Sequence, residues 1–205
     1  MKNLYDEDYY ERGIETNKSC YSNYHWMPEL TIPMAARIVE YLKIREDEKI
    51  LDFGCAKGYL VKALRLLHRE AYGYDISEYA LKSVPVDVKE YVSNEITNQY
   101  DWIISKDVFE HIPYEEIDIL LKDLAQKTKK MFVVVPLGEG EKYVVSAYEL
   151  DSTHIIRENL EWWINKFQEN GFQVVEAKYK VKYIKENWAK WEKGNGFFVL
   201  ESVGQ

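Results

Sequence analysis

The stretch that most constrains the fold is "KILDFGCAKGYLVKALRLL", residues 49–67. Its first residues, Lys49 to Gly54, form an apolar run typical of a fully buried strand. A turn bracketed by Gly54 and Gly58 follows, and from Tyr59 to Leu67 the leucines recur at the spacing of one helix face. A buried strand that passes through a glycine turn into a helix predicts the beginning of an α/β sheet.

The rest of the chain continues this alternation of strands and helices. Helices are expected from Thr31, which would cap the first one, from Ser77, from Tyr114 and over 157–170. The remaining strands are expected at 71–75, 88–92, 101–105, 130–136, 172–183 and 197–203. Because no helix separates the last two strands, they predict an antiparallel edge. The sequence therefore predicts a Rossmann-like, doubly wound α/β fold with seven strands, mostly parallel.

Composition limits the possible partners. With 205 residues, of which 46% are hydrophobic, the chain can bury one sizeable core. A formal net charge of -8 disfavours nucleic acid as the main ligand, because that affinity comes from neutralising phosphates. The longest apolar run, Met131 to Leu137, is far shorter than the ~20 residues that span a bilayer. We expect a cytoplasmic protein without a membrane partner, and the oligomeric state stays open.

The turn after the first strand lacks the pattern of dinucleotide-binding proteins. That pattern, G-x-G-x-x-G, lets the main chain approach a pyrophosphate. Here Gly54, Ala56 and Tyr59 occupy the three glycine positions. An oxidoreductase is therefore the weakest interpretation.

What remains is D-x-G-x-x-x-G, formed by Asp52, Gly54 and Gly58. In doubly wound sheets the ligand lies at the carboxyl ends of the strands, and Asp75 is expected at the end of the next strand. An acid at that place can accept hydrogen bonds from the two hydroxyls of a ribose. The pattern thus favours a ligand that contains a nucleoside.

Three segments, "ILDFGCAKGYLVKAL", "AYGYDISEYAL" and "YDWIISKDVFEHI", occur in this order. Together they resemble the class I S-adenosylmethionine-dependent methyltransferases, over roughly residues 49–203. The resemblance implies S-adenosylmethionine as cofactor and methyl transfer to a substrate as activity. Ala56 departs from it, since many members have glycine there, but alanine is the smallest substitute.

The resemblance also implies which residues bind the cofactor. The loop would hold the methionine part, Asp75 the ribose, Ile76 the adenine ring and Glu95, with Asn94 next to it, the adenine amino group. Lys106 and Asp107 would lie beneath the sulfonium. The implied cofactor-binding residues are Tyr24, Asp52, Gly54, Cys55, Ala56, Gly58, Asp75, Ile76, Glu95, Lys106 and Asp107. Two alternatives stay open: Asp75 could cap a helix together with Ser77, and Glu95 could be a surface carboxylate.

Methylation of a hydroxyl requires a group that accepts its proton, and histidine suits this best near neutral pH. Of the four histidines, His154 in "ELDSTHII" is the first candidate for a base or substrate ligand, and His111 in "DVFEHIP" is the second. Each has a structural alternative. His111 could bond to the main chain at a helix start, and His154 could order its loop through Asp151 or Thr153. Glu110 could orient either histidine or face solvent.

No metal site is predicted from the sequence. The two cysteines lie in unrelated contexts, and no CxxC motif is present. Asp101, Asp107 and the histidines do not form a ligand spacing that is typical of a metal site.

Residues 1–30 are expected to form an N-terminal arm or lid ahead of a methyltransferase domain at 31–205. The arm contains Tyr9, Tyr10, Tyr21, Tyr24 and Trp26, which is too much aromatic surface for a free tail. Aromatic faces attract a sulfonium, so the arm could close over cofactor and acceptor. Simple hydrophobic anchoring of the arm is the alternative.

Taken together, these features favour an O-methyltransferase that acts on a small polar acceptor such as a sugar, a nucleotide sugar or a phosphorylated metabolite. Methylation of nitrogen or of a carboxyl group, on another small molecule or on a protein, is one alternative. A non-catalytic S-adenosylmethionine-binding partner protein is another. An intact cofactor loop with dispensable histidines would indicate the second.

Overall fold

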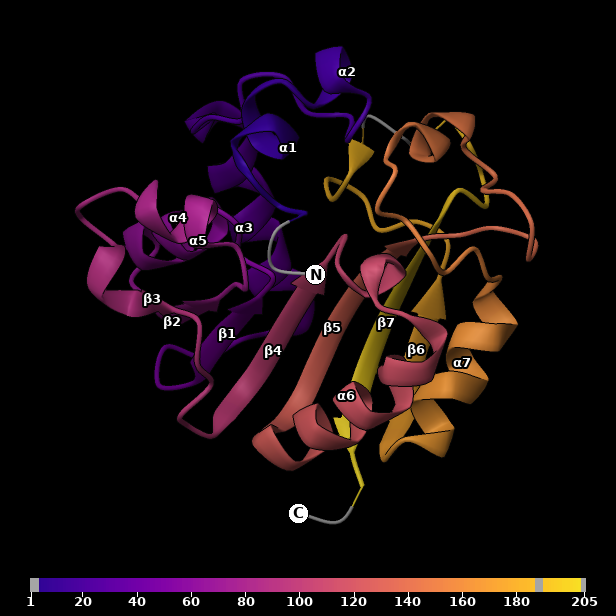
Figure 1. Cartoon of the computed structure of the whole chain (residues 1–205). Helices are drawn as coiled ribbons and strands as arrows, with labels where there is room; N and C mark the ends of the chain where they lie inside the picture. Colours follow the sequence, from indigo (N-terminus) through magenta and orange to yellow (C-terminus); the bar gives the residue numbers. More distant parts are fainter. Residues whose placement is uncertain (1–3, 187–189, 204–205) are drawn as a thin grey trace. The chain divides into compact units, whose positions relative to one another are not determined.

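The computed structural model describes residues 4–186 and 190–203 (Figure 1). These residues belong to two compact units, residues 1–97 and 98–205. The strands form one seven-stranded sheet in the order β3-β2-β1-β4-β5-β7-β6. The pairs β1/β2, β2/β3 and β4/β5 are parallel, whereas β7 runs antiparallel to both β5 and β6. The predicted fold class is confirmed.

The first unit contains three strands and the helices that alternate with them. In chain order its elements are α1 (Glu7–Glu11), α2 (Gly13–Thr16), α3 (Pro28–Leu42), β1 (Lys49–Phe53), α4 (Tyr59–Leu66), β2 (Glu70–Tyr74), α5 (Glu78–Lys82), the 3-10 helix η1 (Lys89–Tyr91) and β3 (Val92–Ser93).

Two boundaries in this unit differ from the sequence prediction. Helix α3 begins at Pro28 rather than after Thr31, because proline fits the first helical position, where no N–H partner is needed. The strand expected at 88–92 is largely a turn. Its main-chain donors are used locally, from Val88 to Pro85 and from Tyr91 to Val88, so only Val92 and Ser93 remain to pair with β2.

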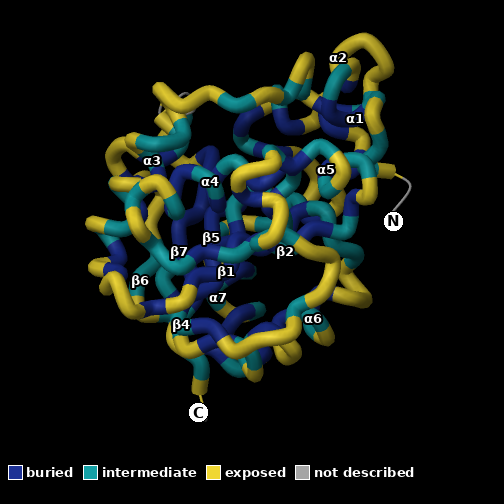
Figure 2. Tube along the Cα trace, turned by 90° about the vertical axis from the view of Figure 1, so that its left-hand side faces the viewer, coloured by how far each residue is buried: buried dark blue, intermediate teal, exposed yellow. Residues whose placement is uncertain are grey.

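The second unit carries the longer strands. In chain order its elements are β4 (Tyr100–Lys106), the 3-10 helix η2 (Phe109–His111), α6 (Tyr114–Lys127), β5 (Thr128–Pro136), the 3-10 helix η3 (Ser146–Leu150), α7 (Leu160–Glu169), β6 (Phe172–Lys178) and β7 (Asn195–Ser202). Residues 131–135 of β5 are fully buried (Figure 2), as expected of a strand covered on both faces.

Helix α7 is shorter than the predicted 157–170, and β6 is shorter than the predicted 172–183. Asn159 fixes the beginning of α7, because its side chain accepts the N–H of Trp162 at 2.9 Å. Gly171 follows the helix with φ of 92°, a left-handed conformation that glycine adopts readily after the end of a helix. Strand β6 pairs with β7 only as far as Lys178, and a register shift occurs between Val174 and Glu176.

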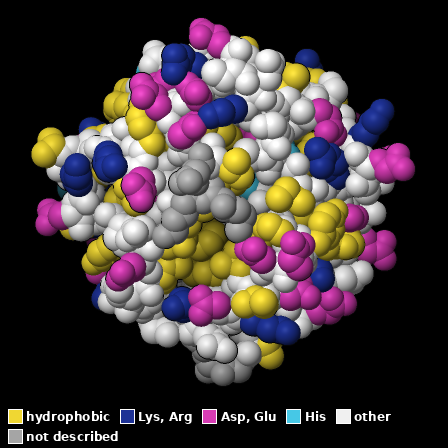
Figure 3. Space-filling view, in the orientation of Figure 1, with side chains coloured by type: hydrophobic (Ala, Val, Ile, Leu, Met, Phe, Trp, Pro, Cys, Tyr) yellow, Lys and Arg dark blue, Asp and Glu magenta, His cyan; other side chains and the backbone are white. Residues whose placement is uncertain are grey.

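On the face shown in Figure 3, Lys and Arg side chains are interspersed with Asp and Glu side chains. This mixture agrees with the acidic net charge of the sequence. Among the described residues, no helix combines the length and the apolar character that crossing a membrane requires.

Candidate functional site

The loop after β1, residues 54–58, has an unusual backbone. Gly54, Ala56 and Gly58 all have positive φ, of 79°, 50° and 71°. Glycine adopts this conformation freely, but an L side chain is strained in it by roughly 1–2 kcal/mol. A Cβ on Gly58 would also lie only 3.2 Å from Cγ2 of Val92. The backbone conformation thus explains why glycine occupies positions 54 and 58. It also shows that Ala56 is held in a conformation that favours glycine.

Asp75 closes this loop from the end of β2. Its carboxylate accepts the N–H of Ala56 at 2.7 Å and that of Ser77 at 2.8 Å, and it is only 7% exposed. Burial raises the pKa of Asp75, and the two main-chain donors act in the opposite direction. Each carboxylate oxygen can accept a further hydrogen bond, so the residue fits a ribose diol without losing these contacts. The helix cap itself is Ser77, which accepts the N–H of Ala80.

The other predicted residues of the first unit take different places. Asp52 is buried in β1, Ile76 is half-buried, and Glu95 is exposed just after β3. The thiol of Cys55 packs against Gly73, where an added Cβ would lie 2.7 Å from its Sγ. Burial raises the pKa of this thiol, which therefore stays protonated, and only its main chain is left for a ligand.

The N-terminal segment, for which the sequence predicts an arm or lid, contains the short helices α1 and α2. It packs on the loop and on α5 through a cluster of aromatic rings. Tyr9, Tyr10 and Ala80 are buried in this cluster, and Tyr5, Tyr21, Tyr24, Ala56 and Tyr79 pack against them. The rings of Tyr10 and Tyr24 are 5.7 Å apart. Ala56 and Tyr24, two of the predicted cofactor residues, thus belong to the same cluster.

An ion pair also ties the arm to the loop. Lys57 lies in the loop with a side chain only 8% exposed, and its ammonium group pairs with Glu11 of α1. The same group donates a hydrogen bond to the carbonyl oxygen of Tyr24 at 2.7 Å. Glu11 in turn accepts the hydroxyl of Tyr79 at 3.0 Å. These contacts connect α1, the loop and α5 around one nearly buried charge.

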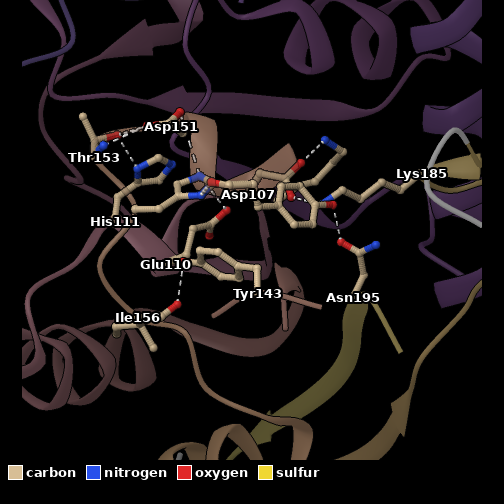
Figure 4. Close-up of polar contacts among 12 residues, drawn as sticks. Asp107, Glu110, His111, Tyr143, Asp151, Thr153, Ile156, Lys185 and Asn195 are labelled. Carbon is tan, nitrogen blue, oxygen red and sulfur yellow. Dashed lines mark hydrogen bonds and ion pairs between the residues drawn. The ribbon is translucent and has the colours of Figure 1, made fainter. Parts of the chain in front are cut away.

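In the second unit, η2 and the segment 151–156 bring His111 and His154 together. Figure 4 shows His111 beside Thr153 and Glu110. The two rings lie edge to face with centroids 4.6 Å apart. The main-chain oxygen of Glu110 accepts N–H groups from Ile155 at 2.7 Å and Ile156 at 2.9 Å. These bonds hold the loop that carries His154 against the turn that carries His111.

Hydrogen bonds at Nδ1 fix the tautomers of both histidines. Thr153 donates its hydroxyl to Asp151 at 2.6 Å, so its oxygen accepts from Nδ1 of His111 at 2.8 Å. Nδ1 of His154 lies 2.9 Å from the carbonyl oxygen of Tyr148, which can only accept. Burial lowers the pKa of His111 to about 4 and also lowers the pKa of His154. Both rings are therefore neutral near pH 7, with the lone pair on Nε2.

Two carboxylates lie beside these rings. Glu110 is fully buried, and neither of its carboxylate oxygens has a hydrogen-bond partner among the described residues. Burial raises the pKa of Glu110 well above its usual range, and the negative charge of Asp107 adds to this. Nε2 of His154 lies 3.9 Å from Oε1 of Glu110 and 3.9 Å from Oδ2 of Asp151. Glu110 therefore does not face solvent.

Asp107 lies at the end of β4 and is held by two ammonium groups. Lys106 donates to it at 2.6 Å, and Lys185 pairs with its other oxygen. Burial alone would raise the pKa of Asp107, but the two lysines outweigh burial and hold the pKa well below its usual range.

Several neighbours of this cluster were not predicted from the sequence. Lys185 lies above the ring of Tyr148, whose hydroxyl donates to Asn195 at 2.6 Å. Tyr143 packs edge-on against His154, with ring centroids 5.3 Å apart. These residues come from separate loops and from β7, so no local motif could reveal them.

Each histidine has a hydrogen-bond partner at Nδ1. Nδ1 of His111 bonds to the side-chain oxygen of Thr153. His154 bonds to the main chain of Tyr148 rather than through Nδ1 to Asp151 or Thr153. The structure thus brings together His111, His154 and Glu110 in one unit, and the loop, Asp75 and Tyr24 in the other.

Comparison with known proteins identifies the family. A family model described as "Methyltransferase domain" matches residues 25–177. No curated protein matches significantly. Among solved structures, the magnesium protoporphyrin IX methyltransferase from Synechocystis with bound S-adenosylhomocysteine is similar, with a TM-score of 0.67 and 14% identity over 98% of this chain and 97% of that one.

Two further structures agree with this result. A methyltransferase from Archaeoglobus fulgidus that depends on S-adenosylmethionine has a TM-score of 0.64 and 16% identity, over 85% of this chain and 97% of that one. An O-methyltransferase from a polyketide synthase multienzyme of Brevibacillus brevis, in complex with S-adenosylhomocysteine, has a TM-score of 0.59 and 14% identity, over 82% of this chain and 72% of that one. With the glycine turn after β1 and the acid at the end of β2, the chain belongs to the class I methyltransferases, enzymes whose cofactor is S-adenosylmethionine.

Proposed function

We propose that this enzyme methylates a hydroxyl group of a small polar acceptor, such as a sugar, a nucleotide sugar or a phosphorylated metabolite. The observation that carries the proposal is the pair of neutral histidines, each with Nδ1 fixed in a hydrogen bond. His154 is buried, and the carboxyl groups of Glu110 and Asp151 each lie 3.9 Å from its Nε2. A hydroxyl loses its proton when it is methylated and therefore requires a nearby proton acceptor. A nucleophile that is already deprotonated at neutral pH, such as a carboxylate, requires none.

S-adenosylmethionine supplies an electrophilic methyl carbon on a sulfonium. In the proposed reaction, a bond forms between the acceptor oxygen and that carbon as the carbon–sulfur bond breaks, which leaves S-adenosylhomocysteine and a methyl ether. His154 accepts the hydroxyl proton on Nε2, and the resulting imidazolium is stabilised by the carboxylate of Asp151, 3.9 Å away. His111 is the second candidate for this role. Holding the reactants in line contributes much of the rate enhancement.

For the cofactor, we propose the residues that the family pattern implies. Asp75 binds the ribose, Ile76 packs on the adenine, and Glu95 or its neighbour Asn94 binds the adenine amino group. The main chain of residues 54–58 holds the methionine part, and Lys106 and Asp107 lie beneath the sulfonium. The arm, residues 1–30, serves as a lid, a role supported by its packing on Ala56 and its ion pair with Lys57.

The first test is calorimetric titration with S-adenosylmethionine and S-adenosylhomocysteine. Wild type should bind both with micromolar affinity, and Asp75→Ala should abolish binding because it removes the acceptor for the ribose hydroxyls. Absence of binding by folded wild type would contradict the assignment of the loop.

The second test is a screen of sugar and phosphorylated acceptors, in which product is detected as a mass increase of one methylene. With an acceptor identified, His154→Gln should lower kcat by about 10²–10⁴ without changing cofactor affinity. His68→Gln is the matched control, because His68 is exposed and lies in the other unit. Equal turnover by wild type and by both His154→Gln and His111→Gln would refute the role of the cluster. Cofactor binding without turnover of any acceptor would instead favour a non-catalytic binding protein.

A further inference from the structure

Three potential metal ligands converge in the second unit. Glu110, His111 and His154 each offer one ligand atom, and these three atoms lie within 4.8 Å of one another. Two of the residues are adjacent in η2, and the third lies 43 positions further along the chain, in the loop held by the main chain of Glu110. The fold, rather than a local motif, creates this cluster.

The cluster contains a buried carboxyl group that no described residue satisfies. His154 carries a proton on Nδ1, so its Nε2 presents a lone pair 3.9 Å from Oε1 of Glu110. The carboxylate oxygens of Glu110 are fully buried, and no described residue donates to them. Acceptors that converge in a buried place repel one another unless a proton or a cation lies among them. A cation satisfies all three groups at once.

We propose that Glu110, His111 and His154 bind a divalent transition-metal ion, of which Zn²⁺ is the representative. Two imidazole nitrogens with one carboxylate oxygen suit Zn²⁺, Co²⁺, Fe²⁺ and Mn²⁺, whereas Mg²⁺ and Ca²⁺ prefer oxygen ligands throughout. Ligands about 2.1 Å from a tetrahedral zinc lie roughly 3.4 Å apart. The 3.9 Å between Nε2 of His154 and Oε1 of Glu110 and the 4.8 Å that bounds all three ligand atoms are wider, so metal binding would draw the ligands inward.

The groups behind the ligands support this assignment. Metal-binding histidines usually donate the other ring N–H to an oxygen, which fixes the ring and increases its basicity. His111 donates through Thr153 to Asp151, and His154 donates to the carbonyl oxygen of Tyr148. A cluster that served only to pack the loop would not require Nε2 of His154 to face the carboxyl groups of Glu110 and Asp151.

The consequence for catalysis rests on the proposed function. Three protein ligands leave coordination positions for an oxygen of the acceptor, and a bound divalent ion lowers the pKa of a hydroxyl that it coordinates. In the metal-loaded enzyme His154 is therefore a metal ligand. The role of His154 as proton acceptor, proposed above, applies to the enzyme without bound metal.

Co²⁺ is the probe for this site, because its visible absorption reports coordination geometry without any methyl transfer. Chelator-treated full-length protein should bind one Co²⁺ per chain, with visible bands that Zn²⁺ abolishes by displacement. His111→Ala and His154→Ala should each weaken binding by at least about 100-fold. Thr153→Val keeps all three ligands but removes the oxygen that orients His111, so it should weaken binding by about 10–100-fold. His68→Ala should bind like wild type, since His68 lies outside the cluster.

Circular dichroism would show that each variant is folded. The proposal is overturned if folded wild type shows no Co²⁺ bands, if both His111→Ala and His154→Ala bind as tightly as wild type, or if Mg²⁺ displaces Co²⁺ as readily as Zn²⁺ does. Metal binding without methylation of any acceptor would count against the proposed function alone.

Discussion

The ion pair between Lys57 and Glu11 allows a quantitative test of how the arm is held. The Lys57 side chain is 8% exposed and that of Glu11 is 23% exposed. Glu11→Ala leaves the ammonium group nearly buried, with the carbonyl oxygen of Tyr24 as its remaining hydrogen-bond acceptor among the contacts described above. Breaking a buried pair by removing one partner typically costs about 3–5 kcal/mol. Because Glu11 is partly exposed and the carbonyl contact remains, we expect a smaller cost of about 2–3 kcal/mol.

This cost should appear as opening of the arm. A loss of 2–3 kcal/mol corresponds to a roughly 30–150-fold increase in the open population. Hydrogen exchange can measure it at the amides of Asn23 and Tyr24, which donate to the main-chain oxygens of Glu11 and Tyr10 at 2.9 and 3.0 Å. Both acceptors persist in the variant, so faster exchange reports opening of the arm and not the loss of a hydrogen bond.

Two further variants test the physical reason. Lys57→Met in the Glu11→Ala background removes the uncompensated charge and should restore most of the protection. Arg12→Ala removes an exposed pair with Asp8 in the same arm and should change protection by no more than about threefold. Our reasoning is wrong if Glu11→Ala exchanges like wild type, or if the double variant is as unprotected as Glu11→Ala.

Three other predictions concern stability. In urea unfolding, Ala56→Gly should lower the free energy of unfolding by about 1–2 kcal/mol less than Ala36→Gly on the exposed face of α3. The reason is that, of these two alanines, only Ala56 has positive φ. Equal losses for the two variants would show that the loop stores no strain. Since burial raises the pKa of Asp75, its contribution to stability should decline as pH rises from about 4 through the raised pKa. Asp75→Asn should therefore flatten this part of the curve of unfolding free energy against pH, and an unchanged slope would contradict the assignment. Asn159→Ala should cost about 1 kcal/mol in thermal unfolding by removing the cap of α7, whereas Asn159→Asp should retain most of it.

The fold could be predicted where burial and periodicity agree. Strands such as β5 are apolar on both faces and long enough to be unmistakable, and the glycine turn after β1 marks where the next helix begins. The errors fall where tertiary contacts decide. Helix α1 has only five residues, too few to be stable alone, and forms because Asp6 caps it and because Tyr9 and Tyr10 are buried. The strand expected at 88–92 was wrong because local turns use its donors.

The candidate site was predictable only in part. Asp75 and the loop 54–58 lie within the sequence motifs themselves, so the motifs are sufficient to locate them. The cluster of Glu110, His111 and His154 depends on how the segment 151–156 folds back on η2, and the spacing of these residues carries no metal signal. Lys185 approaches Asp107 from the segment between the predicted strands 172–183 and 197–203, where the sequence predicts no functional motif. Contacts between distant segments are determined by topology, which periodicity does not describe.

The position of β7 has a consequence for how the chain is synthesised. Strand β6 leaves the ribosome before β7, yet among the described strands β7 is the only one with which it pairs. Until residues 195–202 have emerged, β6 has no ladder partner, and the side of β5 that later pairs with β7 is open to any extended segment nearby. We therefore expect nascent chains arrested before β7 to be the ones that need a chaperone, and those arrested after it to resist protease.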